Sequence, residues 1–73
     1  MDLFILVLDE NEKFHTIVGR RTTTTTVNRE TVLRVEFEEG QSDLRISNPR
    51  LVKVFTNYDE AMNYANSFKK SSL

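Results

Sequence analysis

The chain contains no cysteine and a single histidine, His15, in 73 residues. A disulfide framework is therefore excluded, and a zinc site built from cysteine and histidine lacks its usual ligands. A domain of this size buries only about 60% of the surface that its unfolded chain exposes, so it often needs a disulfide, a metal or a partner subunit. We expect no metal and no cofactor, which leaves a partner subunit open.

The sequence also lacks a long apolar run and an excess of charge of either sign. Its apolar run from Leu3 to Leu8 follows Asp2, has no basic flank and is too short to cross a bilayer. We therefore expect no membrane partner and a cytoplasmic, intracellular location. Ten basic and eleven acidic side chains give a net charge of -1. This balance argues against nucleic-acid binding driven by bulk charge.

The pattern of apolar residues predicts an α+β fold. No linker, repeat or shift in composition divides residues 1–73, which we interpret as a single domain. We predict an antiparallel β-meander of about five strands packed against one C-terminal helix. Extended patterns are found at Leu3 to Leu8, Phe14 to Val18, Thr22 to Thr26, Thr31 to Glu38, Asp43 to Ser47 and Leu51 to Phe55.

The first of these segments is apolar at every position, which is typical of a strand buried on both faces. Side chains alternate, so Leu3, Ile5 and Val7 share one face, and Phe4, Leu6 and Leu8 share the other. One helix covers only one of these faces. We expect the other to be covered either by a strongly bent sheet or by a second protein, which includes a homodimer.

Local signals locate the bends, the hairpins and the helix. Gly19 interrupts its strand and predicts a bulge or bend. The hairpin predicted from Thr31 to Glu38 and Asp43 to Ser47 allows two pairing registers that keep the apolar faces matched. One pairs Arg34 with Arg45, so we favour the other, which a four-residue loop allows and which sets Phe37 opposite Leu44.

The C-terminal helix is predicted to begin after Asn57, an N-cap residue, with Glu60 at the third helical position. Apolar residues then recur at spacings of three and four residues and form one stripe. These residues are Tyr58, Ala61, Met62, Ala65 and Phe68.

Catalytic residues are not indicated. His15 has no second histidine, cysteine or serine at a motif spacing, and Glu36, Glu38, Glu39 and Asp43 gather near one hairpin, where a solvated end is the simpler interpretation. Neither a nucleophile with its base nor a metal-binding set is present. We therefore expect a protein that is not an enzyme.

The candidate binding residues lie in two groups. Arg20 and Arg21 precede a run of five threonines, which predicts an exposed edge strand that adds a strand from another chain. The same arginines and hydroxyls are typical phosphate contacts, so a nucleic-acid- or phosphate-binding module is the alternative. The candidate site comprises Arg20, Arg21, Thr22, Thr24 and Thr26 from this segment, and Phe4 and Leu6 from the first strand.

Small α+β chains without motifs resemble, in a general way, the accessory proteins of bacteriophages, many of which bind a host enzyme or a host defence protein. This resemblance implies an inhibitor or regulator that acts by binding a host protein. Together with the edge strand it favours a small non-catalytic protein-interaction module.

Overall fold

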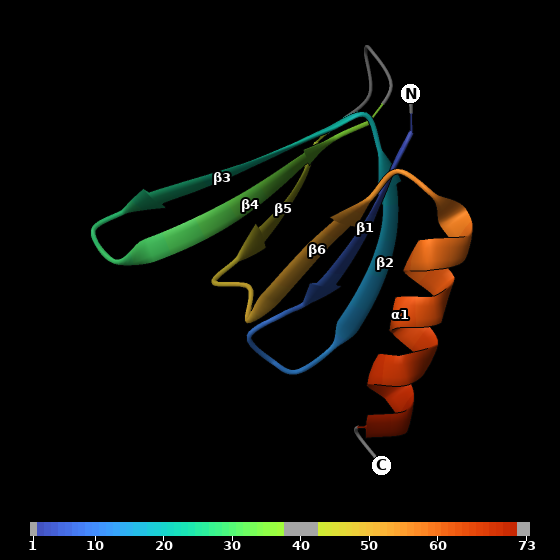
Figure 1. Ribbon diagram of the computed structural model, residues 1–73. Helices are drawn as coiled ribbons and strands as arrows, with labels where there is room; N and C mark the ends of the chain where they lie inside the picture. The colour runs from blue at the N-terminus through green and yellow to red at the C-terminus, as the bar shows by residue number, and fades with distance from the viewer. Residues whose placement is uncertain (1, 38–42, 72–73) are drawn as a thin grey trace.

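The computed structural model describes residues 2–37 and 43–71 and forms an α+β fold with two antiparallel sheets (Figure 1). The first sheet has the strand order β2-β1-β6 and the second has the order β3-β4-β5. The elements are β1 (Leu3–Leu8), β2 (Phe14–Gly19), β3 (Arg21–Val27), β4 (Glu30–Glu36), β5 (Leu44–Ser47), β6 (Leu51–Phe55) and α1 (Tyr58–Ser71). The predicted fold class is confirmed, but the residues that the structure describes form six strands in two sheets and not one meander. Within the described ranges, no helix has the length and apolarity needed to cross a bilayer.

Strand β1 lies at the centre of its sheet and is covered on both faces by the same chain. Ile5 and Val7 are fully buried against Leu33 and Val35 of the second sheet. Leu6 is fully buried on the other face, against the helix. The bent-sheet alternative therefore accounts for the apolar run, and the apolar surplus of β1 is no longer an argument for a second subunit.

The chain passes from one sheet to the other at Gly19 and Arg20. The backbone N–H of Arg20 donates to the carbonyl of Glu36 over 2.8 Å, which draws the bend against β4. A Cβ atom on Gly19 would lie 2.6 Å from Cγ1 of Val35 and 3.1 Å from that same carbonyl oxygen. Glycine is favoured here because a side chain would press against the buried side chain of Val35 and the backbone of Glu36. The bend predicted from the sequence is the corner between the sheets.

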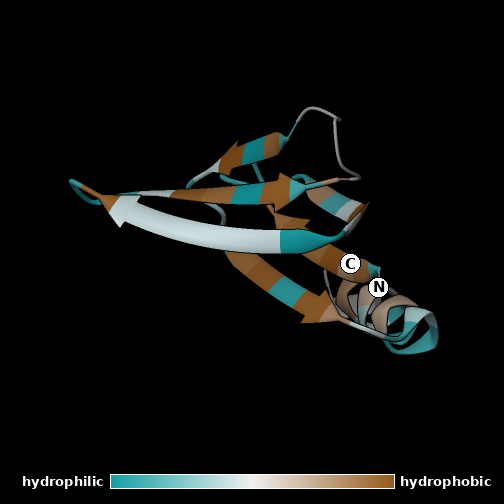
Figure 2. Ribbon diagram, turned by 90° about the horizontal axis from the view of Figure 1, so that it is seen from above, coloured by the Kyte–Doolittle hydropathy of each residue, from teal (hydrophilic) through white to brown (hydrophobic). Residues whose placement is uncertain are grey.

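Strands β3 and β4 form a long hairpin whose end extends past the first sheet (Figure 1). The loop consists of Asn28 and Arg29, with φ values of 53° and 67°. Two successive positive φ values are typical of a type I′ turn, which matches the twist of a two-residue hairpin. Beyond the core residues Leu33 and Val35, the strand residues of this hairpin are mainly threonines, and β3 is accordingly white along most of its length in Figure 2.

The predicted register between β4 and β5 is wrong. The structure sets Val35 opposite Leu44 and Arg34 opposite Arg45, so it adopts the register that pairs like charges directly. The guanidinium of Arg34 turns diagonally, and its Nε donates to the carboxylate of Asp43 over 2.6 Å. The diagonal contact with Asp43 thus offsets the repulsion expected between the directly opposed Arg34 and Arg45. The loop itself, at residues 38–42, lies outside the described residues.

The helix begins as predicted, because the side-chain oxygen of Asn57 accepts a hydrogen bond from the backbone N–H of Glu60 over 3.2 Å. Ala61 and Ala65 are buried against Leu6, and their small side chains bring the helix close to the sheet. Tyr58 is 58% exposed, although it belongs to the predicted apolar stripe. Strand β6 is divided between the two cores, with Val52 packed between the sheets and Phe55 under the helix.

Candidate functional site

The outer strand β3 presents a free edge. It is hydrogen-bonded to β4 on one side, and the second sheet ends with β3 on the other side. Six of its seven residues are exposed, and only Thr22 is half-buried. An unpaired strand of this length displays a row of main-chain donors and acceptors to solvent.

The orientation of that main chain follows from the contacts of Thr31, which lies opposite Thr26 in the hairpin. The N–H of Thr31 donates to the side chain of Asn48 over 3.0 Å, and its carbonyl accepts from the N–H of Asn48 over 2.6 Å. Both backbone groups of Thr31 therefore point away from β3. Its pair with Thr26 is consequently of the type that is not hydrogen-bonded, and the backbone groups of Thr26 point to the free edge.

Alternation along an antiparallel pair extends this result to Thr24 and Thr22, whose N–H and C=O groups also point to the free edge. The residues between them direct their backbone groups to β4. The carbonyl of Glu36, which faces the β3 side and accepts from Arg20, agrees with this alternation. The edge therefore offers three alternate residues as main-chain partners to another strand.

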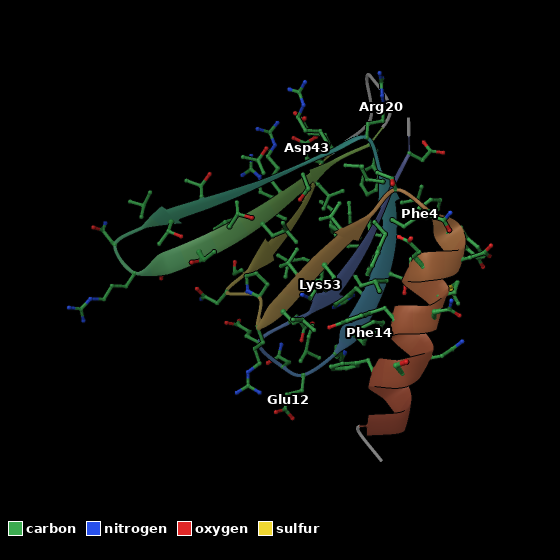
Figure 3. The ribbon with its side chains drawn as sticks, in the orientation of Figure 1. Phe4, Glu12, Phe14, Arg20, Asp43 and Lys53 are labelled. Carbon is green, nitrogen blue, oxygen red and sulfur yellow. The ribbon has the colours of Figure 1, made fainter. Side chains whose placement is uncertain are left out.

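The predicted site residues are not gathered on one surface. Arg21 shares the outer face of the second sheet with Thr23 and Thr25, since its register partner Glu36 lies on that face. Thr22, Thr24 and Thr26 point to the inner face, with Leu33 and Val35. Arg20 lies in the bend and is exposed (Figure 3). The arginines and the predicted threonines thus do not form a common phosphate clamp.

The two predicted residues of β1 belong to the interior. Leu6 has no exposed surface and contacts the helix. The ring of Phe4 meets Tyr58 edge to face, with ring centres 5.6 Å apart, and lies between the sheet and the helix (Figure 3). Leu6 is therefore unavailable to a partner, because the chain's own helix occupies the face on which the sequence placed the interface.

The charges on the outer face of the second sheet are largely neutralised. Nε of Arg21 lies 3.6 Å from the carboxylate of Glu36, and Arg34 pairs with both Glu36 and Asp43. Arg45 is exposed on the same face. Among the described residues, this face therefore carries charges of both signs, whereas a phosphate backbone is attracted by a continuous positive field.

A second polar cluster, which was not predicted from the sequence, fills the loop between β1 and β2. The carboxylate of Asp9 accepts hydrogen bonds from the backbone N–H groups of Asn11 and Lys13, and Nε2 of His15 lies 2.7 Å from its other oxygen. The hydrogen bond from His15, followed by that from Lys13, lowers the pKa of Asp9. The signal in the sequence is an aspartate two residues before an asparagine at a turn.

This cluster organises a loop. All bonds of Asp9 go to its own hairpin, and Arg50 ties the loop to β6 through Glu12 over 2.5 Å. No serine, threonine or cysteine nucleophile bonds to His15 in the part of the chain that the structure describes. Nor do the described residues include a group of three or more side chains suited to a metal ion.

Among the described residues, four large apolar side chains are exposed. Val18 and Tyr58 lie near Phe4 at one end of the helix, and Val54 lies on β6. Val27 is the most exposed, at 61%, and ends strand β3 next to the hairpin turn. The free edge of β3 thus ends at an uncovered apolar residue.

Comparison with known proteins gave no match, since no protein-family model, no curated protein and no solved structure is significantly similar to this chain.

Proposed function

We propose that the chain is a small non-catalytic protein-interaction module that binds an extended segment of another protein along the free edge of β3. The observation that carries the proposal is the orientation of the main chain at Thr22, Thr24 and Thr26, which follows from the bonds between Thr31 and Asn48. Strand addition takes most of its affinity from main-chain hydrogen bonds, and its specificity from alternate side chains. An inhibitor or regulator that binds a host protein is one biological form of this proposal.

The way in which the hairpin is held makes the edge of β3 suitable for an added strand. The hairpin is held rigidly at its base by the buried residues Leu33 and Val35 and at its side by Asn48. A strand that docks there meets donors and acceptors that are already ordered at the base of the hairpin, so ordering entropy is lost mainly at the exposed hairpin end.

The test compares two substitutions at one position. Thr24→Pro removes a backbone N–H that faces the free edge and leaves the ladder to β4 intact, whereas Thr24→Val keeps the N–H and changes only the side chain. Binding to a protein captured from the native host cell should be lost with Thr24→Pro and kept with Thr24→Val. Circular dichroism spectra verify that both variants fold. Equal capture by both variants would contradict the proposal.

Nucleic-acid or phosphate binding through Arg20 and Arg21 is the weaker alternative. Arg21 is already paired with Glu36, and the threonines nearest to it in sequence alternate between two faces. Fluorescence anisotropy with single- and double-stranded oligonucleotides at low salt tests this alternative directly, because phosphate contacts are strongest there. Binding that weakens steeply with salt and is lost on charge reversal at Arg20 would favour it.

A further inference from the structure

We propose that the strand which pairs with the edge of β3 is β3 of a second copy of this chain. The β3-β4-β5 sheets of the two copies then join into one continuous sheet. This inference rests on the proposed function for the edge and names its partner. It starts from the composition of β3, in which five successive threonines lie between Arg21 and Val27. A strand of this kind is nearly the same when it is read in either direction. It therefore suits a two-fold interface, in which one surface must match itself.

The edge geometry selects one register. The residues whose backbone groups face outward are Thr22, Thr24 and Thr26, and antiparallel strands exchange both bonds only between such residues. Placing Thr24 of one copy opposite Thr24 of the other also sets Thr22 opposite Thr26. All three outward-facing residues of each copy are then paired, and the two-fold axis passes beside Thr24.

The side chains are compatible in this register. Threonine lies opposite threonine at each of the central positions, and such cross-strand pairs stabilise a sheet. One threonine pair already occurs within the hairpin, where the hydroxyl oxygens of Thr26 and Thr31 lie 2.9 Å apart. On the outer face, Arg21 of one copy lies opposite Val27 of the other.

That last pair covers an exposed apolar residue and brings no like charges together. Val27 is 61% exposed in the single chain, and the aliphatic part of an opposing Arg21 covers it. Glu30 lies beside Val27 in its own hairpin, while Glu36 lies beside Arg21. Each Arg21 therefore has its own Glu36 on one side and Val27 of the second copy on the other, with Glu30 of that copy one strand further away. No like charges stand opposite one another.

The neighbouring registers are worse. A shift of two residues in one direction sets Arg21 opposite Arg29 of the second copy and pairs like charges. A shift in the other direction sets Val27 opposite Gly19, which lies buried in the corner between the sheets. Both shifts also leave one of the outward-facing threonines without a threonine partner. Repulsion and steric exclusion thus fix the register that the repeated threonines alone would leave free to slide.

The test uses opposite charges at the two-fold position. Sedimentation velocity of the whole chain at rising concentration should show a shift from monomer to dimer. Thr24→Lys and Thr24→Glu should each weaken the dimer by about tenfold or more, because like charges then meet across the axis, and an equimolar mixture of the two variants should restore it. Thr16→Lys makes the same change on an exposed position of β2 and should leave the dimer intact.

A wild-type chain that stays monomeric at the highest concentration overturns the inference, as does a dimer that survives both charge variants. A mixture that fails to dimerise overturns the register centred on Thr24. The outcome for the proposed function is separate. If the chain is monomeric but Thr24→Pro still abolishes capture of another protein, the edge is the binding site and only the second copy is refuted. If Thr24→Pro changes neither property, both proposals fail.

Discussion

Replacing Gly19 with alanine tests the corner on which the two-sheet arrangement depends. The added Cβ would lie 2.6 Å from Cγ1 of Val35, whereas ordinary contacts between carbon atoms begin near 3.5 Å. Val35 is fully buried, and its branched side chain has few alternative rotamers, so it has little freedom to withdraw. The backbone carbonyl of Glu36, 3.1 Å away, restricts movement in the other direction. The strain must therefore be shared by the core and the bend.

The size of the effect follows from two opposing contributions. Overpacking of a core by one methyl group costs about 1–3 kcal/mol. The loss of glycine restricts the unfolded chain and returns about 0.4–1 kcal/mol. We expect Gly19→Ala to lower the free energy of unfolding by about 1–2 kcal/mol. For a domain of this length, the melting temperature should fall by about 5–15 °C.

Urea unfolding followed by far-ultraviolet circular dichroism measures this change, and the dependence of stability on urea should stay constant if only the native state is strained. Val35→Ala removes the methyl group in conflict. In that background, Gly19→Ala should cost about 1 kcal/mol less than in the wild type, because the two substitutions are coupled through one contact. The reasoning is refuted if Gly19→Ala changes the free energy of unfolding by less than about 0.5 kcal/mol. An equal cost in both backgrounds would refute it as well.

Three further predictions concern single side chains. Thr22→Val should raise the free energy of unfolding by about 1 kcal/mol in urea unfolding, because the buried hydroxyl of Thr22 has no hydrogen-bond partner among the described residues. The same substitution at the exposed Thr24 should change the free energy of unfolding little. Arg29→Gly should stabilise the chain by about 0.5–1 kcal/mol, since φ is positive there; a loss of stability would contradict the type I′ turn. The lowered pKa of Asp9 stabilises the fold above the unfolded pKa, and this contribution is lost as pH falls below about 4. Thermal melts should therefore show Asp9→Asn to be less stable than the wild type at pH 7, with the difference shrinking towards pH 3; a constant difference would contradict the assignment.

Sequence patterns predicted the elements whose causes are local. Asn57 caps the helix because its own side chain reaches the helix N-terminus, and the continuous apolar run of β1 is buried on both faces as its composition requires. The edge position of β3 could also be predicted from the sequence, because threonines without an apolar face suit a strand that the core does not cover.

The remaining features depend on contacts between residues that are distant in sequence. Gly19 predicted a bend, but the division into two sheets arises where that glycine meets Val35. The register of β5 depends on a diagonal bond from Arg34 to Asp43, which a rule for directly opposed pairs does not include. For a similar reason the sequence did not show that Leu6 is buried, since the helix that covers it lies far along the chain.

The bonds between Asn48 and Thr31 divide the hairpin into parts of unequal local stability. Asn48 forms hydrogen bonds with both the N–H and the C=O of Thr31. The buried residues Leu33 and Val35 lie two and four positions after Thr31 on the same strand. On the turn side of Thr31, the residues from Thr23 to Glu30 are all exposed. Native-state amide exchange should therefore be fast in the hairpin end and slow from Thr31 onward, because the end opens without unfolding the core. A strand bound along β3 would extend the slow-exchanging region to the tip.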